Sequence, residues 1–193
     1  AGTRNGARVV RNTGGKASVL YDFPGQEVTA LDVGAGFVAV ASNEFADAPA
    51  PQGDAAKDAA ARLKRPKPGK GKVYALAFDG KAEELYAIDS SHVSALEIEA
   101  QTGAVFVGLA QEGRVMRVTR AGERALYADA DERQVVSLEL ASAAPHFVTS
   151  DGVAVYRLKD KSPEGVWTSA VLDAKVPARF GQLEFRSGGK GAL

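Results

Sequence analysis

The stretch at residues 92–129 contains four short runs: V-S-A-L-E-I-E (93–99), A-V-F-V-G-L-A (104–110), G-R-V-M-R-V-T-R (113–120) and E-R-A-L-Y-A-D (123–129). Each run is rich in β-branched, aromatic or alternating apolar residues, which is typical of β-strands. Turn-forming residues, such as Gly103 and Gly122, separate the runs. Four strands in fewer than forty residues predict one antiparallel sheet with short connections.

The same pattern recurs along the chain. A glycine that opens one run precedes a V-x-x-L run by 22 residues in three pairs: Gly6 and Val28, Gly71 and Val93, and Gly113 and Val135. Successive copies lie 42 residues apart (Gly71 to Gly113) and 39 residues apart (Gly113 to Gly152). That period is the length of a four-stranded β-propeller blade. The sequence therefore predicts an all-β fold of four-stranded antiparallel repeats, each a blade in part of a larger propeller.

Thirteen strands are predicted from these repeats: 7–11, 18–22, 28–33, 37–42, 72–78, 84–88, 93–98, 105–110, 114–119, 124–129, 135–140, 146–150 and 153–158. They make the outer half of one blade, two complete blades and three strands of another. The first six residues match the end of a second strand and its turn. Such repeats bury their faces only against neighbouring repeats, so we expect the remaining blades, or a partner chain, to close the propeller.

Two parts of the chain depart from the repeat. We assign residues 1–162 to partial propeller blades, with residues 46–69 as an inserted loop. The loop is expected to carry a short helix at 55–64, which Pro66 ends. Residues 163–193 are either the last strand of the final blade or the start of a C-terminal β-sandwich; the lone Trp167 favours the second. Packing in a core is the commoner fate of the aromatic residues there, Trp167, Phe180 and Phe185, although they could form a platform for a sugar.

Composition excludes several kinds of site. The chain has 24 basic and 24 acidic residues, so no overall charge attracts nucleic acid or an anionic membrane. It has no Cys and only two His, which excludes disulfides and thiolate zinc sites and leaves little for imidazole-based metal sites. The uncharged runs, such as residues 33–43, are too short for a membrane-spanning helix. We expect no cofactor and no transmembrane segment.

The most distinctive charged feature is a basic stretch of six cations with no acid between them: Arg62, Lys64, Arg65, Lys67, Lys70 and Lys72. A mobile basic arm of this kind could bind phosphate, an anionic polysaccharide or acidic lipid. No aromatic residue lies among the cations, so bases have no surface to stack on. A solvated loop is the simpler interpretation, and the stretch is kept as a possible anion-binding loop.

Three other clusters of polar residues lack the arrangement that a catalytic or metal-binding site requires. Ser90, Ser91 and His92 follow Asp89, but neighbours along a strand point to opposite faces, so a catalytic triad is not expected. The same argument applies to the set His146, Ser150 and Asp151. The acidic turn Asp129, Asp131 and Glu132 lacks the spacing of a calcium loop. Gly34 and Gly36 belong to a hairpin turn rather than a phosphate-binding loop. No residue is assigned a catalytic, cofactor-binding or metal-binding role.

Several motifs carry a resemblance to a known family. G-K-V-Y-A-L (71–76), V-F-V-G-L-A-Q-E-G-R-V-M-R-V (105–118) and R-A-L-Y (124–127) resemble the blades of bacterial WD40-like or YVTN-like propellers. T-S-A-V-L-D-A (168–174) and R-F-G-Q-L-E-F (179–185) look like the segment that follows the propeller in a group of envelope proteins. The resemblance implies a periplasmic or extracellular location in a bacterium and brings no catalytic residue with it.

These observations lead to three functional hypotheses. The first is a non-enzymatic binding or scaffold protein of the bacterial envelope, whose loops contact a protein or a polysaccharide. The second is a hydrolase or lyase whose catalytic residues lie on blades outside this chain. The third is a structural subunit of a surface assembly.

Overall fold

The structure, a computed structural model, describes residues 1–46 and 69–159. The chain divides into two units, Ala1–Lys159 and Asp160–Leu193, and only the first contains described residues. The helix expected at 55–64, the strands expected after residue 163 and the aromatic residues Trp167, Phe180 and Phe185 lie outside the described residues. Every regular element of the described ranges is a β-strand, which confirms the all-β prediction.

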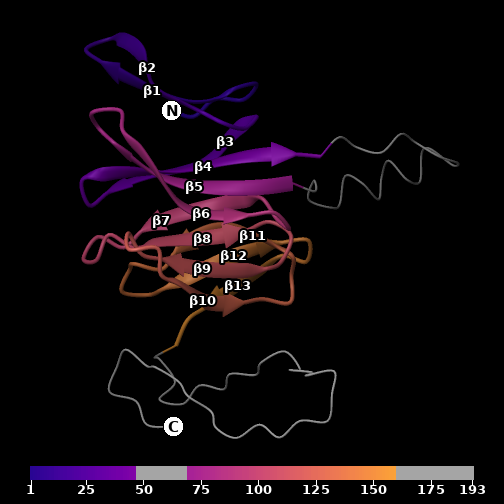
Figure 1. The fold of residues 1–193 in the computed structure, drawn as a ribbon. Helices are drawn as coiled ribbons and strands as arrows, with labels where there is room; N and C mark the ends of the chain where they lie inside the picture. Colours follow the sequence, from indigo (N-terminus) through magenta and orange to yellow (C-terminus); the bar gives the residue numbers. More distant parts are fainter. Residues whose placement is uncertain (47–68, 160–193) are drawn as a thin grey trace, which may run out of the picture. The chain divides into compact units, whose positions relative to one another are not determined.

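The described ranges contain thirteen strands (Figure 1), each of which overlaps a predicted one: β1 (Ala7–Thr13), β2 (Lys16–Phe23), β3 (Glu27–Gly34), β4 (Phe37–Phe45), β5 (Gly69–Ala77), β6 (Ala82–Ile88), β7 (Val93–Ile98), β8 (Val105–Leu109), β9 (Arg114–Val118), β10 (Arg124–Asp129), β11 (Gln134–Glu139), β12 (His146–Ser150) and β13 (Ala154–Arg157). The bounds of β7, β10 and β12 agree with the prediction. The predictions succeed because alternating apolar residues and turn glycines are local signals.

The strands form four separate antiparallel sheets, and each joins strands that are consecutive in the chain. A two-stranded sheet contains β1–β2, a first four-stranded sheet β3–β6, a second four-stranded sheet β7–β10 and a three-stranded sheet β11–β13. Each of these sheets is open, and none of them closes on itself. Residues at the N-terminus extend the two-stranded sheet, since Gly2 bridges to Val9 and the main-chain N–H of Val10 donates to Ala1 O at 2.8 Å.

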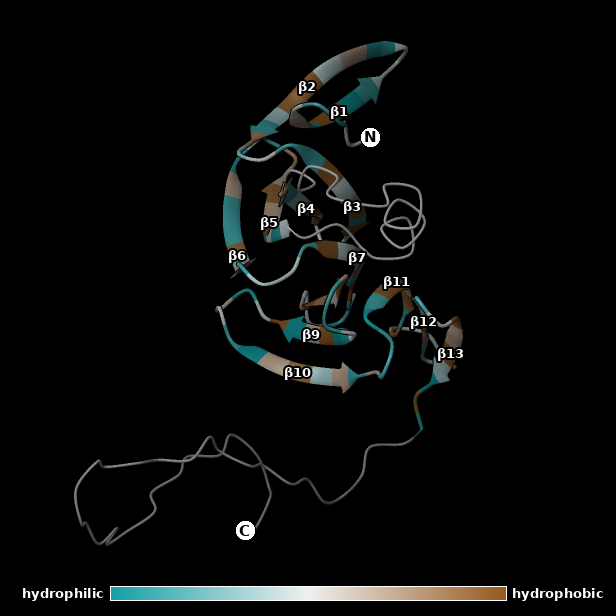
Figure 2. Cartoon of the chain, turned by 90° about the vertical axis from the view of Figure 1, so that its right-hand side faces the viewer, coloured by the Kyte–Doolittle hydropathy of each residue, from teal (hydrophilic) through white to brown (hydrophobic). Residues whose placement is uncertain are grey.

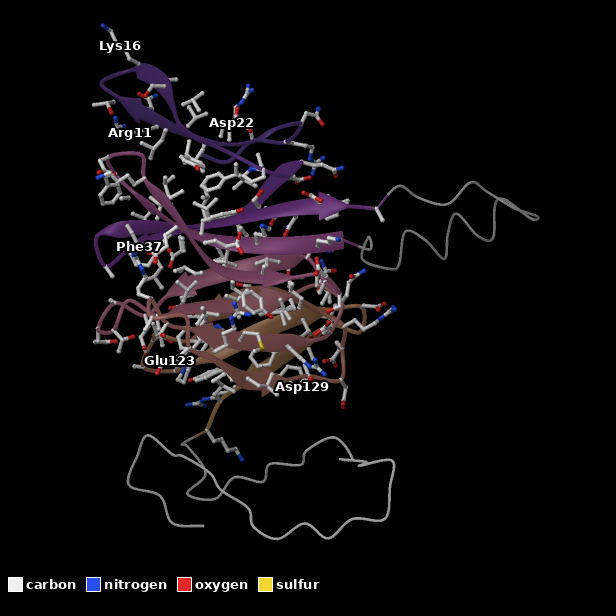
Figure 3. The ribbon with its side chains drawn as sticks, viewed as in Figure 1. Arg11, Lys16, Asp22, Phe37, Glu123 and Asp129 are labelled. Carbon is white, nitrogen blue, oxygen red and sulfur yellow. The ribbon has the colours of Figure 1, made fainter. Side chains whose placement is uncertain are left out.

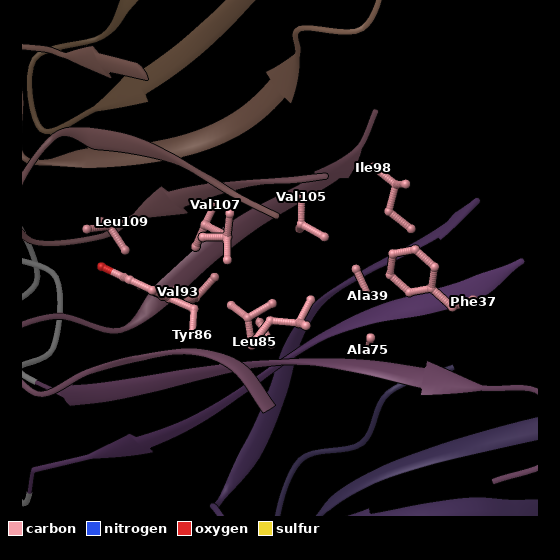
Figure 4. Close-up of a cluster of buried hydrophobic side chains, with 13 residues drawn as sticks. Phe37, Ala39, Ala75, Leu85, Tyr86, Val93, Ile98, Val105, Val107 and Leu109 are labelled. Atoms are coloured by element: carbon pink, nitrogen blue, oxygen red, sulfur yellow. The ribbon is translucent and has the colours of Figure 1, made fainter. Parts of the chain in front are cut away.

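Apolar side chains fill the space between successive sheets. The largest cluster lies between the two four-stranded sheets and includes Phe37, Leu85, Val93, Val105 and Val107 (Figure 4). Similar clusters join the first four-stranded sheet to β1–β2 and the second to β11–β13. Because both faces of the middle sheets are covered, β4 and β8 are almost entirely buried. Strand β5 is buried along residues 73–76 as well.

The first strands of the last three sheets are neighbours in space. Strand β7 contacts both β3 and β11, and the three lie along one side of the stack, whereas β6 and β10 lie along the other (Figure 2). Strand β10, at the outer edge of its sheet, is only partly buried, whereas the second strand of the same sheet, β8, is buried throughout. Sheets that follow one another in the chain are therefore also neighbours in space.

Two carboxylates join neighbouring sheets at the same position of their strands. Asp32 on β3 accepts a hydrogen bond from the main-chain N–H of Ile98 at 2.6 Å. Glu97 on β7, four residues after Val93 as Asp32 is after Val28, accepts from Leu140 at 2.5 Å and from Ala141 at 2.8 Å. Ionised acceptors make stronger bonds than neutral ones. Each carboxylate therefore binds main-chain N–H groups at, or just after, the end of the first strand of the next sheet.

Hydroxyl groups repeat the pattern at the start of the same strands. Thr29 Oγ1 donates to the main-chain oxygen of Val93 at 2.8 Å, and Ser94 Oγ donates to the main-chain oxygen of Val135. We call the carboxylate and hydroxyl bonds together the inter-sheet link. In the three-stranded sheet the corresponding positions are Val136, which has no hydroxyl, and Glu139, which is exposed.

We expect Glu97→Ala to lower the free energy of unfolding by about 1.5–3 kcal/mol, because hydrogen bonds to charged groups contribute about that much. Glu139→Ala is the matched control: within the described residues its carboxylate makes no hydrogen bond or ion pair, so the expected change is near zero. Denaturant unfolding of both variants tests the link. Equal stabilities for the two variants would contradict it.

Candidate functional site

A pocket of about 340 Å³ lies at the end of the sheets where the β3–β4, β5–β6 and β9–β10 turns gather. Figure 3 labels Phe37, and Glu123 of the β9–β10 turn, at this end of the sheets, and Asp129 at the opposite end. The lining residues are Ala35, Gly36, Phe37, Ala75, Ala77, Lys81, Ala82, Glu83 and Arg120. Both four-stranded sheets therefore contribute to it, and its volume is within the range of small-ligand sites.

The local sequence explains why the pocket is open. Ala35 and Gly36 both have positive φ angles, 47° and 85°, as the two central residues of a tight hairpin turn require. This turn starts β4 at Phe37, whose ring is buried. Alanines occupy the ends of β5 and β6 beside it, at Ala77 and Ala82, and their methyl groups leave the space unfilled. The wall is therefore apolar.

Charged side chains form the rim. The guanidinium of Arg120 lies over the Phe37 ring, 4.8 Å from its centre, and its Nη2 donates to Glu83 Oε2 at 2.7 Å. Lys81 is exposed and pairs with Asp79 at 3.3 Å. Two cations and one carboxylate line the pocket, so its lining has a net positive charge. Arg120 contacts one aromatic ring and one carboxylate. Its guanidinium can therefore bind the anionic group of a ligand whose apolar part lies beside the ring.

Sequence reasoning missed this site. Phe37 and Arg120 come from different sheets, and the residues around the pocket are mostly alanine and glycine, which carry no chemical signal. One feature of the sequence is relevant: residues 79–83 and 119–123 are both turns that carry acidic and basic side chains. Charged turns of this kind are also common where no ligand binds.

The basic stretch is only partly described. Arg62, Lys64, Arg65 and Lys67 lie outside the described residues, whereas Lys70 and Lys72 lie on β5. Lys70 pairs with Asp89 at 3.4 Å, and Lys72 Nζ donates to Glu84 Oε2 at 2.8 Å. The hydrogen bond to Glu84 raises the pKa of Lys72. These two lysines therefore have acidic partners, and the anion-binding hypothesis depends on the other four cations.

The cluster at residues 89–92 does not converge. The carboxylate of Asp89 is exposed and pairs with Lys70, while Ser90 Oγ donates to Glu112. Ser91 is buried, where its hydroxyl donates to the main-chain oxygen of His92 at 3.1 Å. The His92 ring is also buried, edge-on to Phe45 with ring centres 4.9 Å apart. These side chains make separate contacts around the turn into β7.

The second set, His146, Ser150 and Asp151, is also dispersed. The His146 ring lies 2.9 Å from the main-chain oxygen of Ala144. Ser150 donates to Gln134 at 2.8 Å, and Asp151 accepts from Arg133 Nε at 2.8 Å. Each side chain thus holds its own part of β11–β12. The G-x-G at residues 34–36 forms the hairpin turn expected for it.

The acidic turn is directed toward its own sheets. Asp129 pairs with Arg114 at 3.5 Å, and Glu132 accepts a hydrogen bond of 2.6 Å from the hydroxyl of Tyr156. This bond lowers the pKa of Glu132 and raises that of Tyr156. In the described ranges, no three acidic or histidine side chains gather as they would around a metal ion.

We expect Tyr156→Phe to raise the pKa of Glu132 toward the ordinary glutamate value, because the hydroxyl that stabilises the carboxylate is lost. The stabilising contribution of Glu132 is complete above the ordinary pKa of glutamate and is lost as the pH falls through its lowered value. Carbon-13 NMR titration of the carboxyl group measures the change. The aromatic stack of Tyr156 on Phe147, with ring centres 4.9 Å apart, should survive in the variant; an unchanged pKa would show that the bond is absent in solution.

Comparison with known proteins adds no assignment. No protein-family model matches the chain, and no curated protein is significantly similar to it. Among the described residues, no helix is long and apolar enough to cross a membrane.

Proposed function

We propose that residues 1–159 form consecutive blades of a β-propeller that acts as a non-enzymatic binding scaffold. The observation that carries this proposal is the inter-sheet link. Asp32 and Glu97 make the same bond from successive first strands, as is expected when one structural unit is repeated about a common axis. The spacing of 22 residues between corresponding glycines and valines supports the same interpretation.

A close contact between sheets also recurs. A Cβ atom on Gly108 would lie 2.8 Å from Val135 Cγ1, and a Cβ on Gly2 would lie 2.7 Å from Val28 Cβ. Val28 and Val135 occupy matching places in the sequence repeat, and so do Gly2 and Gly108 once one extra residue in the turn before Gly113 is allowed for. Such approaches leave no room for a side chain. The packing of β1–β2 on the first four-stranded sheet therefore resembles the packing of the second four-stranded sheet on β11–β13.

Further blades, on the same polypeptide or on a partner chain, are part of the proposal. The outer face of β11–β13 presents Val155, which is 67% exposed, together with the exposed Val136 and Glu139. The corresponding faces of the two preceding sheets are covered by the next sheet. A further sheet on this face would bury these valines and offer main-chain donors to Glu139.

The proposed role is to present turns and the 46–69 segment to a protein or polysaccharide at the surface of a bacterium. The support for this role is the basic stretch, four of whose cations follow one another within residues 62–67, and the resemblance of the blade motifs to envelope propellers. Anionic polysaccharide is the ligand class that such a stretch fits, because cation-rich segments bind polyanions by releasing counterions.

A glycan array tests the proposed function. We expect the chain to bind acidic polysaccharides at low salt and to lose most of that binding when residues 46–69 are deleted. Lys72→Gln is the matched control, because Lys72 is already paired with Glu84, and it should bind nearly as well as the original chain. Mass spectrometry of the bound glycan should show it intact. Shortened or unsaturated products would indicate a hydrolase or lyase instead, and binding unchanged by the deletion would remove the basic stretch from the proposal.

A further inference from the structure

The pocket between the two four-stranded sheets is separate from the basic stretch and has a ligand chemistry of its own. Its wall is made of Phe37 and small apolar residues, and its rim carries Arg120, Lys81 and Glu83. An apolar wall beside a guanidinium suits a ligand that has an apolar body and a single negative group.

The Arg120–Glu83 ion pair is the interaction that the carboxylate of such a ligand would replace. Arg120 has five N–H donors in a planar fork, and among the described residues the acid that it contacts in the pocket is Glu83. Both side chains are exposed to a considerable degree, 44% for Arg120 and 57% for Glu83. An exposed ion pair contributes little stability, so a ligand carboxylate can replace Glu83 at small cost. Phe37 meanwhile keeps the guanidinium over the pocket.

We propose that this pocket binds a small organic carboxylate with an apolar body, such as an aromatic acid. The carboxylate pairs with the Arg120 guanidinium in place of Glu83, and the apolar body lies against Phe37 and the alanines at the ends of β5 and β6. Lys81 adds a second positive charge at the rim. The proposal goes beyond the scaffold role, because it does not need the 46–69 segment or any further blade.

Benzoate is the probe, and benzamide, which has nearly the same shape and no charge, is the matched control ligand. We expect benzoate to cause saturable amide shifts at Gly36, Ala77 and Lys81 in proton–nitrogen NMR spectra of the full chain, and benzamide to bind at least several-fold more weakly. Equal affinity for the two ligands, or no saturable shift at these amides, would overturn the proposal.

Two substitutions at the pair should act in opposite directions. Arg120→Gln should weaken benzoate binding about tenfold or more, because the charged partner is lost. Glu83→Gln should tighten it about two- to fivefold, because the competing carboxylate is removed from an exposed pair. If the ion pair served only to hold the structure, the two substitutions would not change the benzoate affinity in opposite directions. Weaker binding in both variants would therefore contradict the proposal.

Two further variants separate the pocket from the rest of the hairpin. Ala77→Leu fills the wall and should abolish binding while leaving the charges in place. Arg124→Gln removes a guanidinium on the same β9–β10 hairpin that lies over Tyr86, 5.2 Å from the ring centre, and should leave the affinity unchanged. If Arg124→Gln weakened binding as much as Arg120→Gln, the effect would come from total charge and the pocket assignment would be wrong.

Discussion

Gly113→Ala is expected to lower the free energy of unfolding by about 2–4 kcal/mol. Gly113 has a φ of +65°, which costs an alanine about 1 kcal/mol. A Cβ there would also lie 2.6 Å from the main-chain oxygen of Ala130 and closer still to that of Glu132. Backbone atoms cannot rotate away as a side chain can, and overpacking of this kind adds about 1–3 kcal/mol. Denaturant unfolding of the variant gives the value.

The same position has a structural role that makes the loss large. The main-chain N–H of Gly113 donates to Arg133 O at 2.7 Å, and its oxygen accepts from Ala130 at 3.0 Å. These bonds join the start of β9 to the turn that leads into β11. Gly122→Ala is the matched control, because Gly122 has a φ of +83° and open space around it; it should cost only about 1 kcal/mol. Similar losses in both variants would show that φ alone matters.

Asn43→Ala is expected to lower the free energy of unfolding by about 2–3 kcal/mol. Asn43 lies at the end of β4 and is fully buried. Its Oδ1 accepts from the main-chain N–H of Val93 at 3.0 Å, and its Nδ2 donates to Val93 O at 2.7 Å and to Thr29 Oγ1 at 2.6 Å. Removing the amide takes a side-chain partner from buried polar groups, which costs about 1–3 kcal/mol, and leaves a small cavity besides.

Asn43→Asp separates hydrogen bonding from volume. The carboxylate still accepts from Val93 N–H, but it cannot donate to Val93 O unless it is protonated. Burial favours the neutral form and should raise the pKa of the new aspartate. Relative to the original chain, this variant should therefore lose stability as the pH rises through that raised value, whereas Asn43→Ala should show no such dependence. A pH-independent loss in both would indicate that only packing at this position matters.

Several properties could be predicted from the sequence because they depend on neighbours along the chain. Strand positions follow from short runs of β-branched, aromatic and other apolar residues bounded by turn residues, as in β8. The grouping of consecutive strands into sheets follows from the repeat of about forty residues, which marks the same strand positions in each copy. The positive φ angles at Ala35 and Gly36 follow from the demands of a two-residue hairpin turn.

Spacing along the chain groups Lys70 and Lys72 with the basic stretch, whereas the fold places them on β5 beside acids from β6 and the turn after it. Antiparallel pairing brings residues 70–72 close to residues 84–89, so the charges of a strand are balanced by its partner rather than by its neighbours in sequence.

By itself the sequence determined that this protein is all-β, where its strands lie, and that they pair with their neighbours along the chain, because each of these properties is set by short-range periodicity and turn chemistry. Only the tertiary structure decided which polar groups join the sheets and where a ligand could bind. Asn43 meets Val93, and Phe37 meets Arg120, only because successive sheets pack face to face and bring together residues that are distant in sequence. No local pattern specifies such contacts.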